Sequence, residues 1–118
     1  MTRTEVSRDF HISESLLSSY ETSGLIQCHR GTDGEPVYQE REVRLVGEIS
    51  SLLNTGMDQE ALRRYLSLKN EARNTRPEQV RILRSHRAKL LEDLHGCQSA
   101  LEQVDYIIYE TEKGRNHS

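Results

Sequence analysis

A heptad repeat in the last third of the chain restricts the possible folds more than any other feature of the sequence. Between Pro77 and Lys113, Gly96 is the only glycine or proline, which predicts one helix of about 35 residues and about 50 Å. A domain of about 70 residues cannot cover so long an apolar stripe, so we expect the helix to pair with a second copy of the chain. The alternative is a helix that folds back on its own domain. The seam positions alternate at spacings of four and three and are polar only at Arg87: Leu83, Arg87, Leu90, Leu94, Cys97, Leu101, Val104 and Ile108.

Length and composition exclude several classes of protein. At 118 residues the chain is one domain, or a small domain with an extension. It contains no run of eighteen apolar residues and no charged-then-apolar leader, which predicts a cytoplasmic protein without a membrane partner. Cys28 and Cys97 are far apart and form no CxxC pair, so we expect no metal site, disulfide or cofactor. Because no side chains are grouped at catalytic spacing, an enzyme is not expected.

The stretch from Ile12 to Ile26 has both the start and the end of a short helix. Ser13 can accept hydrogen bonds from the free N–H groups of a first turn, and Gly24 can take the left-handed conformation that ends a helix. A shorter amphipathic helix precedes it, with a capping box at Thr2–Glu5 and with His11, which tolerates a positive φ, at the turn. Two short helices joined by a tight turn predict a helix-turn-helix.

Turn signals after this helix predict a small β-hairpin, or wing. Gly31 and Asp33-Gly34 lie between candidate strands near residues 27–30 and 35–38, and Asp-Gly suits a two-residue connection. Adjacent strand residues point to opposite faces, so Cys28 and His29 are not expected to bind one metal ion. Cys28 is instead expected to be a partly buried thiol.

Two further amphipathic helices are predicted before the heptad repeat. One covers residues 39–53 and ends at Gly56, and the next begins after Asp58 and runs to about Glu71. Arg76 precedes a proline and should be extended, with Pro77 in the first turn of the long helix. The predicted fold is mainly α: a winged helix-turn-helix domain at 1–72, a connector at 73–76, a dimerisation helix at 77–113 and a flexible tail at 114–118.

Short motifs occur along the chain in a recognisable order. The helix-turn-helix contains Ile12-Ser13, then Leu17-Ser18-Ser19-Tyr20-Glu21 and Gly24-Leu25-Ile26, and the wing ends in Asp33-Gly34-Glu35-Pro36-Val37-Tyr38. This order resembles the MerR family of bacterial transcription regulators, where the corresponding motifs are Gly-Val-Ser, Thr-Leu-Arg-Tyr-Tyr-Glu, Gly-Leu-Ile and Asn-Gly-Tyr-Arg. The chain resembles a divergent, short member without a distinct effector domain. Two arginines with which the family contacts phosphate are replaced here by Ser18 and Pro36.

The resemblance implies a homodimer that binds a palindromic promoter element in double-stranded DNA and alters its geometry. The second helix would enter the major groove, an antiparallel coiled coil would set the half-site spacing, and RNA polymerase would be a further partner. The heptad seam would form the dimer interface. The expected DNA contacts, with Arg8 and Arg44 as further candidates, are Arg3, Ser13, Ser15, Ser18, Ser19, Tyr20, Arg30, Tyr38 and Arg41.

Several of these assignments have a second interpretation. Tyr20 and Tyr38 could be core residues, and Cys97 could be either a small seam residue or a thiol sensor. The net charge is −3, whereas a nucleic-acid binder usually has a basic surplus. The alternative function is therefore a protein-interaction module built on a winged helix whose DNA contacts have decayed.

Overall fold

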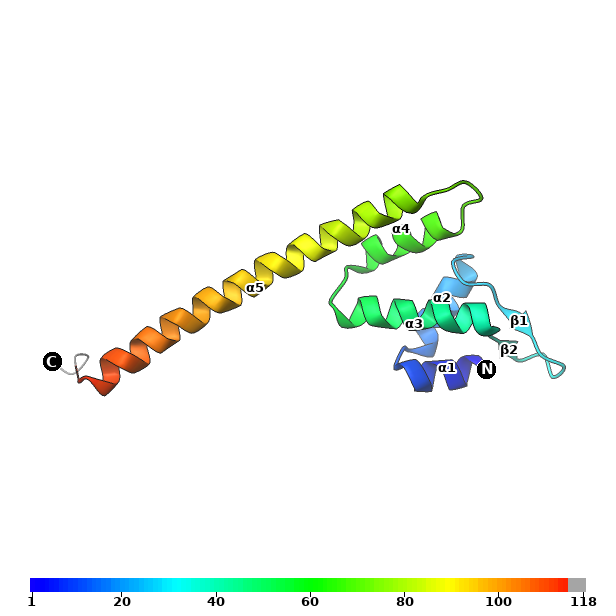
Figure 1. Cartoon of the computed structure of the whole chain (residues 1–118). Coiled ribbons are helices and arrows are strands. Elements are labelled where there is room, and N and C mark those ends of the chain that lie inside the picture. Colours follow the sequence, from blue (N-terminus) through cyan, green and yellow to red (C-terminus); the bar gives the residue numbers. More distant parts are fainter. Residues whose placement is uncertain (115–118) are drawn as a thin grey trace. The chain divides into compact units, whose positions relative to one another are not determined.

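The computed structural model describes residues 1–114, which form five helices and one small sheet (Figure 1). The chain divides into two compact units, Met1–Gln79 and Val80–Ser118. No helix within the described residues is long and apolar enough to cross a membrane. The tail predicted at 114–118 lies, from residue 115 onward, outside the described residues. The elements in chain order are α1 (Arg3–Phe10), α2 (Glu14–Thr22), β1 (His29–Arg30), β2 (Pro36–Val37), α3 (Glu40–Asn54), α4 (Gln59–Lys69) and α5 (Arg76–Glu112).

The first two helices have the ends that the sequence predicted. Thr2 and Glu5 form a capping box at the start of α1, and the Oγ of Ser13 accepts a hydrogen bond from the N–H of Leu16 at the start of α2. His11 joins the helices at φ 55°, in the left-handed region. After α2, the N–H of Leu25 donates to the carbonyl of Tyr20 and the N–H of Gly24 to that of Glu21. With Gly24 at φ 75°, this is a Schellman motif.

The core of the first unit joins all four of its complete helices. Helices α1 and α2 pack against each other, α1 packs on α3, and α3 packs on α4. The buried apolar residues come from each of these helices and from the loops between them: Val6, Ile12, Leu17, Tyr20, Ile26, Tyr38, Val46, Ile49, Met57, Leu62, Tyr65 and Leu66. Helix α2 and the end of the wing are therefore anchored in one hydrophobic core.

The wing is an antiparallel pair in which His29 lies opposite Val37 and Arg30 opposite Pro36. Its turn is longer than the two-residue connection suggested by Asp33-Gly34. The N–H of Gly31 donates to the carbonyl of Glu35 at 2.9 Å, and Gly34 takes φ 81° inside the loop. This is the arrangement of a three-residue connection with a left-handed glycine. The start of the chain lies along β2, since Thr2 forms an isolated bridge with Val37.

Helix α5 begins at Arg76, one residue earlier than predicted. The residue before a proline is usually extended, but a first-turn proline lacks only an N–H that a helix terminus leaves unpaired. Thr75 lies just before the helix and is 2 % exposed. Its hydroxyl donates to the carbonyl of Leu68 at 2.6 Å and accepts from the Gln79 side chain at 2.9 Å. These two bonds attach the start of α5 to the end of α4.

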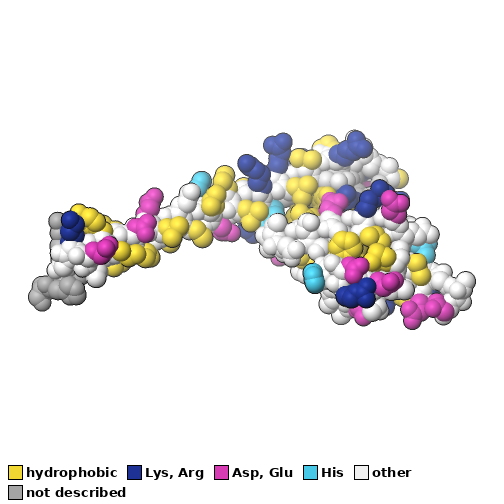
Figure 2. Space-filling view, turned by 60° about the horizontal axis from the view of Figure 1, so that its bottom comes forward, with side chains coloured by type: hydrophobic (Ala, Val, Ile, Leu, Met, Phe, Trp, Pro, Cys, Tyr) yellow, Lys and Arg dark blue, Asp and Glu magenta, His cyan; other side chains and the backbone are white. Residues whose placement is uncertain are grey.

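The long helix is continuous through Gly96 and contains no buried residue along Arg76–Glu112. Its 37 residues correspond to about 55 Å of helix. Large apolar side chains remain exposed along it, including Leu94 at 53 %, Leu101 at 63 % and Val104 at 54 %. In Figure 2 hydrophobic side chains follow one another along this helix.

Candidate nucleic-acid interface

The exposed side of α2 carries four hydroxyl side chains at helical spacing. Ser15, Ser18, Ser19 and Thr22 are related by three and four residues, so they share one face of the helix. We call these four residues the hydroxyl face. None of them is buried, whereas Leu17 and Tyr20 on the same helix are fully buried. Small hydroxyl groups can donate to or accept from phosphates and base edges, so this face has the chemistry of a DNA-reading helix.

Tyr20 and Tyr38 require a correction to the predicted set of DNA contacts. Their residues are 0 % and 1 % exposed. The Tyr20 hydroxyl is 3.3 Å from the side-chain oxygen of Gln59, and the Tyr38 hydroxyl donates to Glu21 at 2.6 Å. Burial raises the pKa of both phenols, so both stay neutral donors. The structure thus assigns both rings to the core. Each tyrosine ring is mostly apolar, and its one polar atom, the hydroxyl oxygen, has a hydrogen-bond partner.

Glu21 connects the wing to the first two helices. Its carboxylate accepts two hydrogen bonds from the Arg3 guanidinium, at 2.8 and 2.9 Å, besides the bond from Tyr38. The Arg3 bonds, more than any other contact, lower the pKa of Glu21 to about 2. Burial and this carboxylate raise the pKa of the Cys28 thiol, which makes the thiol less reactive. Arg3, predicted to contact DNA, is therefore already paired within the protein.

The wing presents one of the predicted basic residues at its turn. Arg30 is exposed, and its guanidinium donates to the carbonyl of Gly34 at 3.1 Å. Behind the turn, the His29 ring lies 3.4 Å from the carboxylate of Glu42, a buried residue on α3. Glu42 also caps the backbone at Gln39. The tip of the wing is thus free to contact a ligand while its base is fixed to α3.

Arg63 was not predicted to lie at this surface. It comes from α4, and its guanidinium donates to the Oγ of Ser19 at 2.7 Å and to the Oγ of Ser23 at 3.4 Å. It also lies over the ring of Tyr20, 5.1 Å from the centroid. The sequence separation hid this contact. The sequence held one indirect signal, because no lysine or arginine occurs between Arg8 and Arg30. A basic side chain near α2 therefore had to come from another element.

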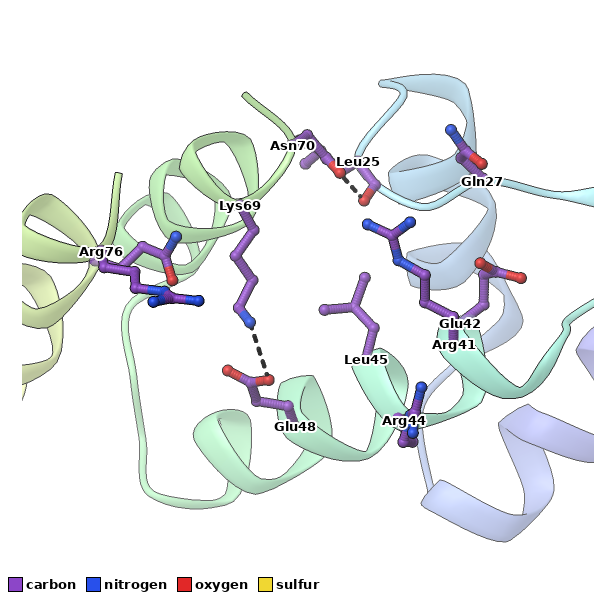
Figure 3. A pocket seen from close by; sticks show the side chains of 11 residues that line it. Leu25, Gln27, Arg41, Glu42, Arg44, Leu45, Glu48, Lys69, Asn70 and Arg76 are labelled. Carbon is purple, nitrogen blue, oxygen red and sulfur yellow. Dashed lines mark hydrogen bonds and ion pairs between the residues drawn. The ribbon is translucent and has the colours of Figure 1, made fainter. Parts of the chain in front are cut away.

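Arg41 lies in a separate hollow of about 490 Å³ between the loop after α2, α3, the end of α4 and the start of α5 (Figure 3). Arg44, Lys69 and Arg76 line the same hollow beside Leu45. Lys69 is 3.4 Å from Glu48, and Arg44 is 3.8 Å from Glu40. The structure therefore does not group Arg41 with the hydroxyl face, and places it in a hollow that basic side chains share with Glu42 and Glu48.

The predicted dimer residues are accessible in the single chain. Leu90 is 38 % exposed and Ile108 is 50 % exposed, while Arg87 and Cys97 are also exposed. Leu83 is half-buried. Within residues 1–114, no group of three or more His, Cys, Asp or Glu side chains is arranged to hold a metal ion.

Comparisons with known proteins agree on one family. The model described as the MerR HTH family regulatory protein matches residues 1–69. A solved structure of a MerR family transcriptional regulator from Listeria monocytogenes is 26 % identical, with a TM-score of 0.77 over 95 % of this chain and 86 % of that one. A search among curated proteins found no match.

Two more distant structures share the fold. HiNmlR, a MerR family regulator that lacks the sensor domain and was solved bound to promoter DNA, is 17 % identical, with a TM-score of 0.73 over 98 % of this chain and 89 % of that one. A MerR family regulator from Bacillus thuringiensis is 20 % identical, with a TM-score of 0.69 over 93 % of this chain and 97 % of that one.

Proposed function

The chain belongs to the MerR family of helix-turn-helix regulators, and from this premise we propose that it acts as a homodimer on a palindromic promoter element. The observation that carries the proposal is the hydroxyl face of α2, which is accessible while Leu17 and Tyr20 on the opposite side of the helix are buried in the core. A regulator of this kind acts in the cytoplasm, where bacterial promoters lie. HiNmlR, which has a similar fold, was solved with promoter DNA. By analogy, α2 would enter the major groove and Arg30 at the wing turn would contact the backbone.

The exposed apolar residues of α5 support the proposed dimer. Leucines exposed at 53 % and 63 %, at positions 94 and 101, would otherwise face water. In an antiparallel pair centred between Leu94 and Cys97, Leu83 of one chain would lie near Ile108 of the other and Leu90 near Leu101. The proposed division is then 1–72 for DNA, 73–76 as connector and 77–113 for dimerisation.

The proposed mechanism is control of promoter shape. Two copies held by one coiled coil would present their α2 helices to two half-sites at a fixed separation. DNA that bends or untwists to fit both helices costs a few kcal/mol, and this deformation would change how RNA polymerase engages the promoter. No residue of this chain is proposed to carry out a chemical reaction.

A salt series of DNA binding tests the proposal. The chain is titrated onto the promoter fragment of its own gene and onto a scrambled fragment of the same length, from about 50 to 200 mM salt. We expect affinity that falls steeply with salt and a preference for the promoter fragment of about a thousandfold or more. Binding that is equal for both fragments would contradict sequence-specific regulation.

The second candidate function is a protein-interaction module. The observation that favours it is the acidic character of α2, which contains Glu14 and Glu21 and no lysine or arginine. The same titration separates the two functions, because a module with decayed contacts would bind no duplex even at the lowest salt concentration.

A further inference from the structure

The recognition helix lacks the charge that a DNA-binding helix normally needs. Residues 9–29 contain no lysine or arginine, and α2 itself carries two glutamates. Affinity for DNA comes largely from cations that neutralise phosphates and release counterions. If the proposed function holds, a cation must therefore reach the hydroxyl face from another element.

We propose that Arg63 of α4 is this cation and that it binds a DNA phosphate beside Ser19. The inference rests on the proposed function, but it assigns a contact that neither the sequence nor the comparisons gave. The Arg63 guanidinium is fixed by Ser19 at 2.7 Å, by Ser23 at 3.4 Å and by the Tyr20 ring at 5.1 Å from its centroid. Arg63 is thus the basic residue attached to the hydroxyl face of α2.

The partners of Arg63 orient its charge without neutralising it. Two hydroxyl groups and an aromatic ring carry no net negative charge, and among the described residues no carboxylate forms an ion pair with Arg63. A guanidinium has five N–H donors, and the two serines occupy two of them. Three donors remain for an anion, and a phosphate accepts such a fork in two parallel hydrogen bonds.

Arg3 shows the opposite arrangement at the other edge of α2. Its guanidinium donates twice to the Glu21 carboxylate, and its side chain is 24 % exposed. Binding a phosphate there would require breaking an internal ion pair, or placing the phosphate next to a carboxylate. Of the two arginines within residues 1–114 that donate to side chains of α2, Arg63 has a charge without an ionic partner, and Arg3 has a structural role.

Because Arg63 is already held in place in the free chain, it loses less side-chain conformational entropy when it binds a phosphate. A mobile arginine loses side-chain freedom when a ligand orders it. Arg63 is half-buried and already held at three points in the free chain. Its serine partners are hydroxyl groups, so they can shift to the phosphate oxygens without leaving a buried charge unpaired.

The test compares Arg63→Gln with Arg64→Gln. Glutamine keeps a long stem over Tyr20 and a donor for Ser19 but has no charge, so a merely structural link between α4 and α2 is largely retained. Arg64 is the next residue on α4, is exposed and gives a matched loss of charge. Both variants and the wild type are titrated onto the promoter fragment across the salt series, and their melting temperatures are recorded to check folding.

We expect Arg63→Gln to weaken binding at least about tenfold at 100 mM salt and to reduce the slope of log affinity against log salt by about 1.8 for a dimer, or about 0.9 per phosphate. Arg64→Gln should change the slope by less than half of this. Equal slopes for the two variants, with the wild type still binding, would overturn this inference and leave the proposed function intact. Absence of duplex binding by the wild type would overturn the proposed function and this assignment with it.

Discussion

The carboxylate of Glu21 links three segments of the first unit. Arg3 from α1 donates to it twice, Tyr38 donates from the end of the wing, and the thiol of Cys28 lies close to it. Without Glu21, the half-buried Arg3 guanidinium would lose its carboxylate partner and the buried Tyr38 hydroxyl would lose its acceptor. Glu21 therefore joins α2 both to α1 and to the end of the wing.

The first prediction concerns the pH dependence of this network. The pKa of Glu21 falls from 4.5 to about 2, chiefly through Arg3, which corresponds to about 3 kcal/mol of stability. A lowered pKa stabilises the fold above pH 4.5, and this contribution is lost as the pH falls from 4.5 to 2. We expect Glu21→Gln to be less stable than the wild type by about 2–3 kcal/mol at pH 7, with a difference that disappears near pH 2.

Urea denaturation of both proteins between pH 2 and pH 7 measures this effect. Glu35→Gln is the control, because Glu35 is exposed on the wing loop. A constant difference between Glu21→Gln and the wild type over the whole pH range would show that the carboxylate charge is not what stabilises the network.

At the scale of single residues, local features could be predicted from the sequence and tertiary contacts could not. The Ser13 cap, the Gly24 end and the positive φ of His11 depend only on neighbours in the chain. The place of Tyr20 depended on whether the core had room for its ring, which helical spacing does not reveal. The contact of Arg63 with Ser19 joins positions separated by 44 residues, and the gap in basic residues between Arg8 and Arg30 does not identify which distant arginine makes it.

Among the helices, α3 and α5 differ in how tightly their glycines are packed. Gly47 of α3 faces Phe10 of α1, and a Cβ at Gly47 would lie 3.3 Å from the aromatic ring. A Cβ at Gly96 of α5 would have no atom within 4 Å in the single chain. The same substitution thus meets a packed interface in one helix and open space in the other.

The second prediction uses this pair of glycines. Gly96→Ala should stabilise the fold by up to about 1 kcal/mol, since alanine favours helix over glycine by that amount. Gly47→Ala has the same gain in helix propensity but must displace the Phe10 ring, so we expect it to gain less than half as much or to be destabilised. Thermal unfolding followed by circular dichroism gives both values, and equal stabilisation would contradict close packing of α1 on α3.

The starts of α1, α2 and α4 followed from their end signals, whereas the start of α5 and the length of the wing loop did not. Asp58 caps α4 as predicted, with its carboxylate accepting from the N–H of Ala61. The wing connection is longer than expected because Gly31 pairs with Glu35. The Asp33-Gly34 motif predicts a turn but does not determine which residues on either side of it pair. Each strand has only two residues, which is too few for an alternation of apolar and polar residues to be recognised in the sequence.

For the whole molecule, the exposed apolar seam of α5 is the feature on which the proposed assembly rests. Its seam contains no buried residue in the single chain, whereas the first unit has a complete core. The heptad spacing predicted the helix correctly because it is regular over the entire length. The existence and the antiparallel direction of the pair remain predictions, since both depend on a second chain.

The third prediction tests this pairing. Leu101→Glu places a charge at a seam position, and Ser99→Glu places the same charge on the same helix at the position most distant from the seam in the heptad. We expect the wild type and Ser99→Glu to be dimers at micromolar concentration and Leu101→Glu to be monomeric, with operator affinity reduced about a hundredfold or more because the half-sites are no longer bound together.

Analytical ultracentrifugation of the three proteins, followed by the promoter titration, measures both effects. A monomeric wild type at micromolar concentration would remove the coiled coil from the description of this protein. A dimeric Leu101→Glu variant would show that the seam lies elsewhere on α5.

The hydroxyl face has a consequence for engineering. Its side chains make no contact on which the core depends, since Leu17, Tyr20 and Glu21 fix the helix from the other side. Ser15, Ser18 and Thr22 can therefore be randomised in a library while the scaffold, with Ser19 and Arg63, stays constant. Selection from such a library against new promoter sequences would yield a set of switches that share one fold and do not recognise one another's operators.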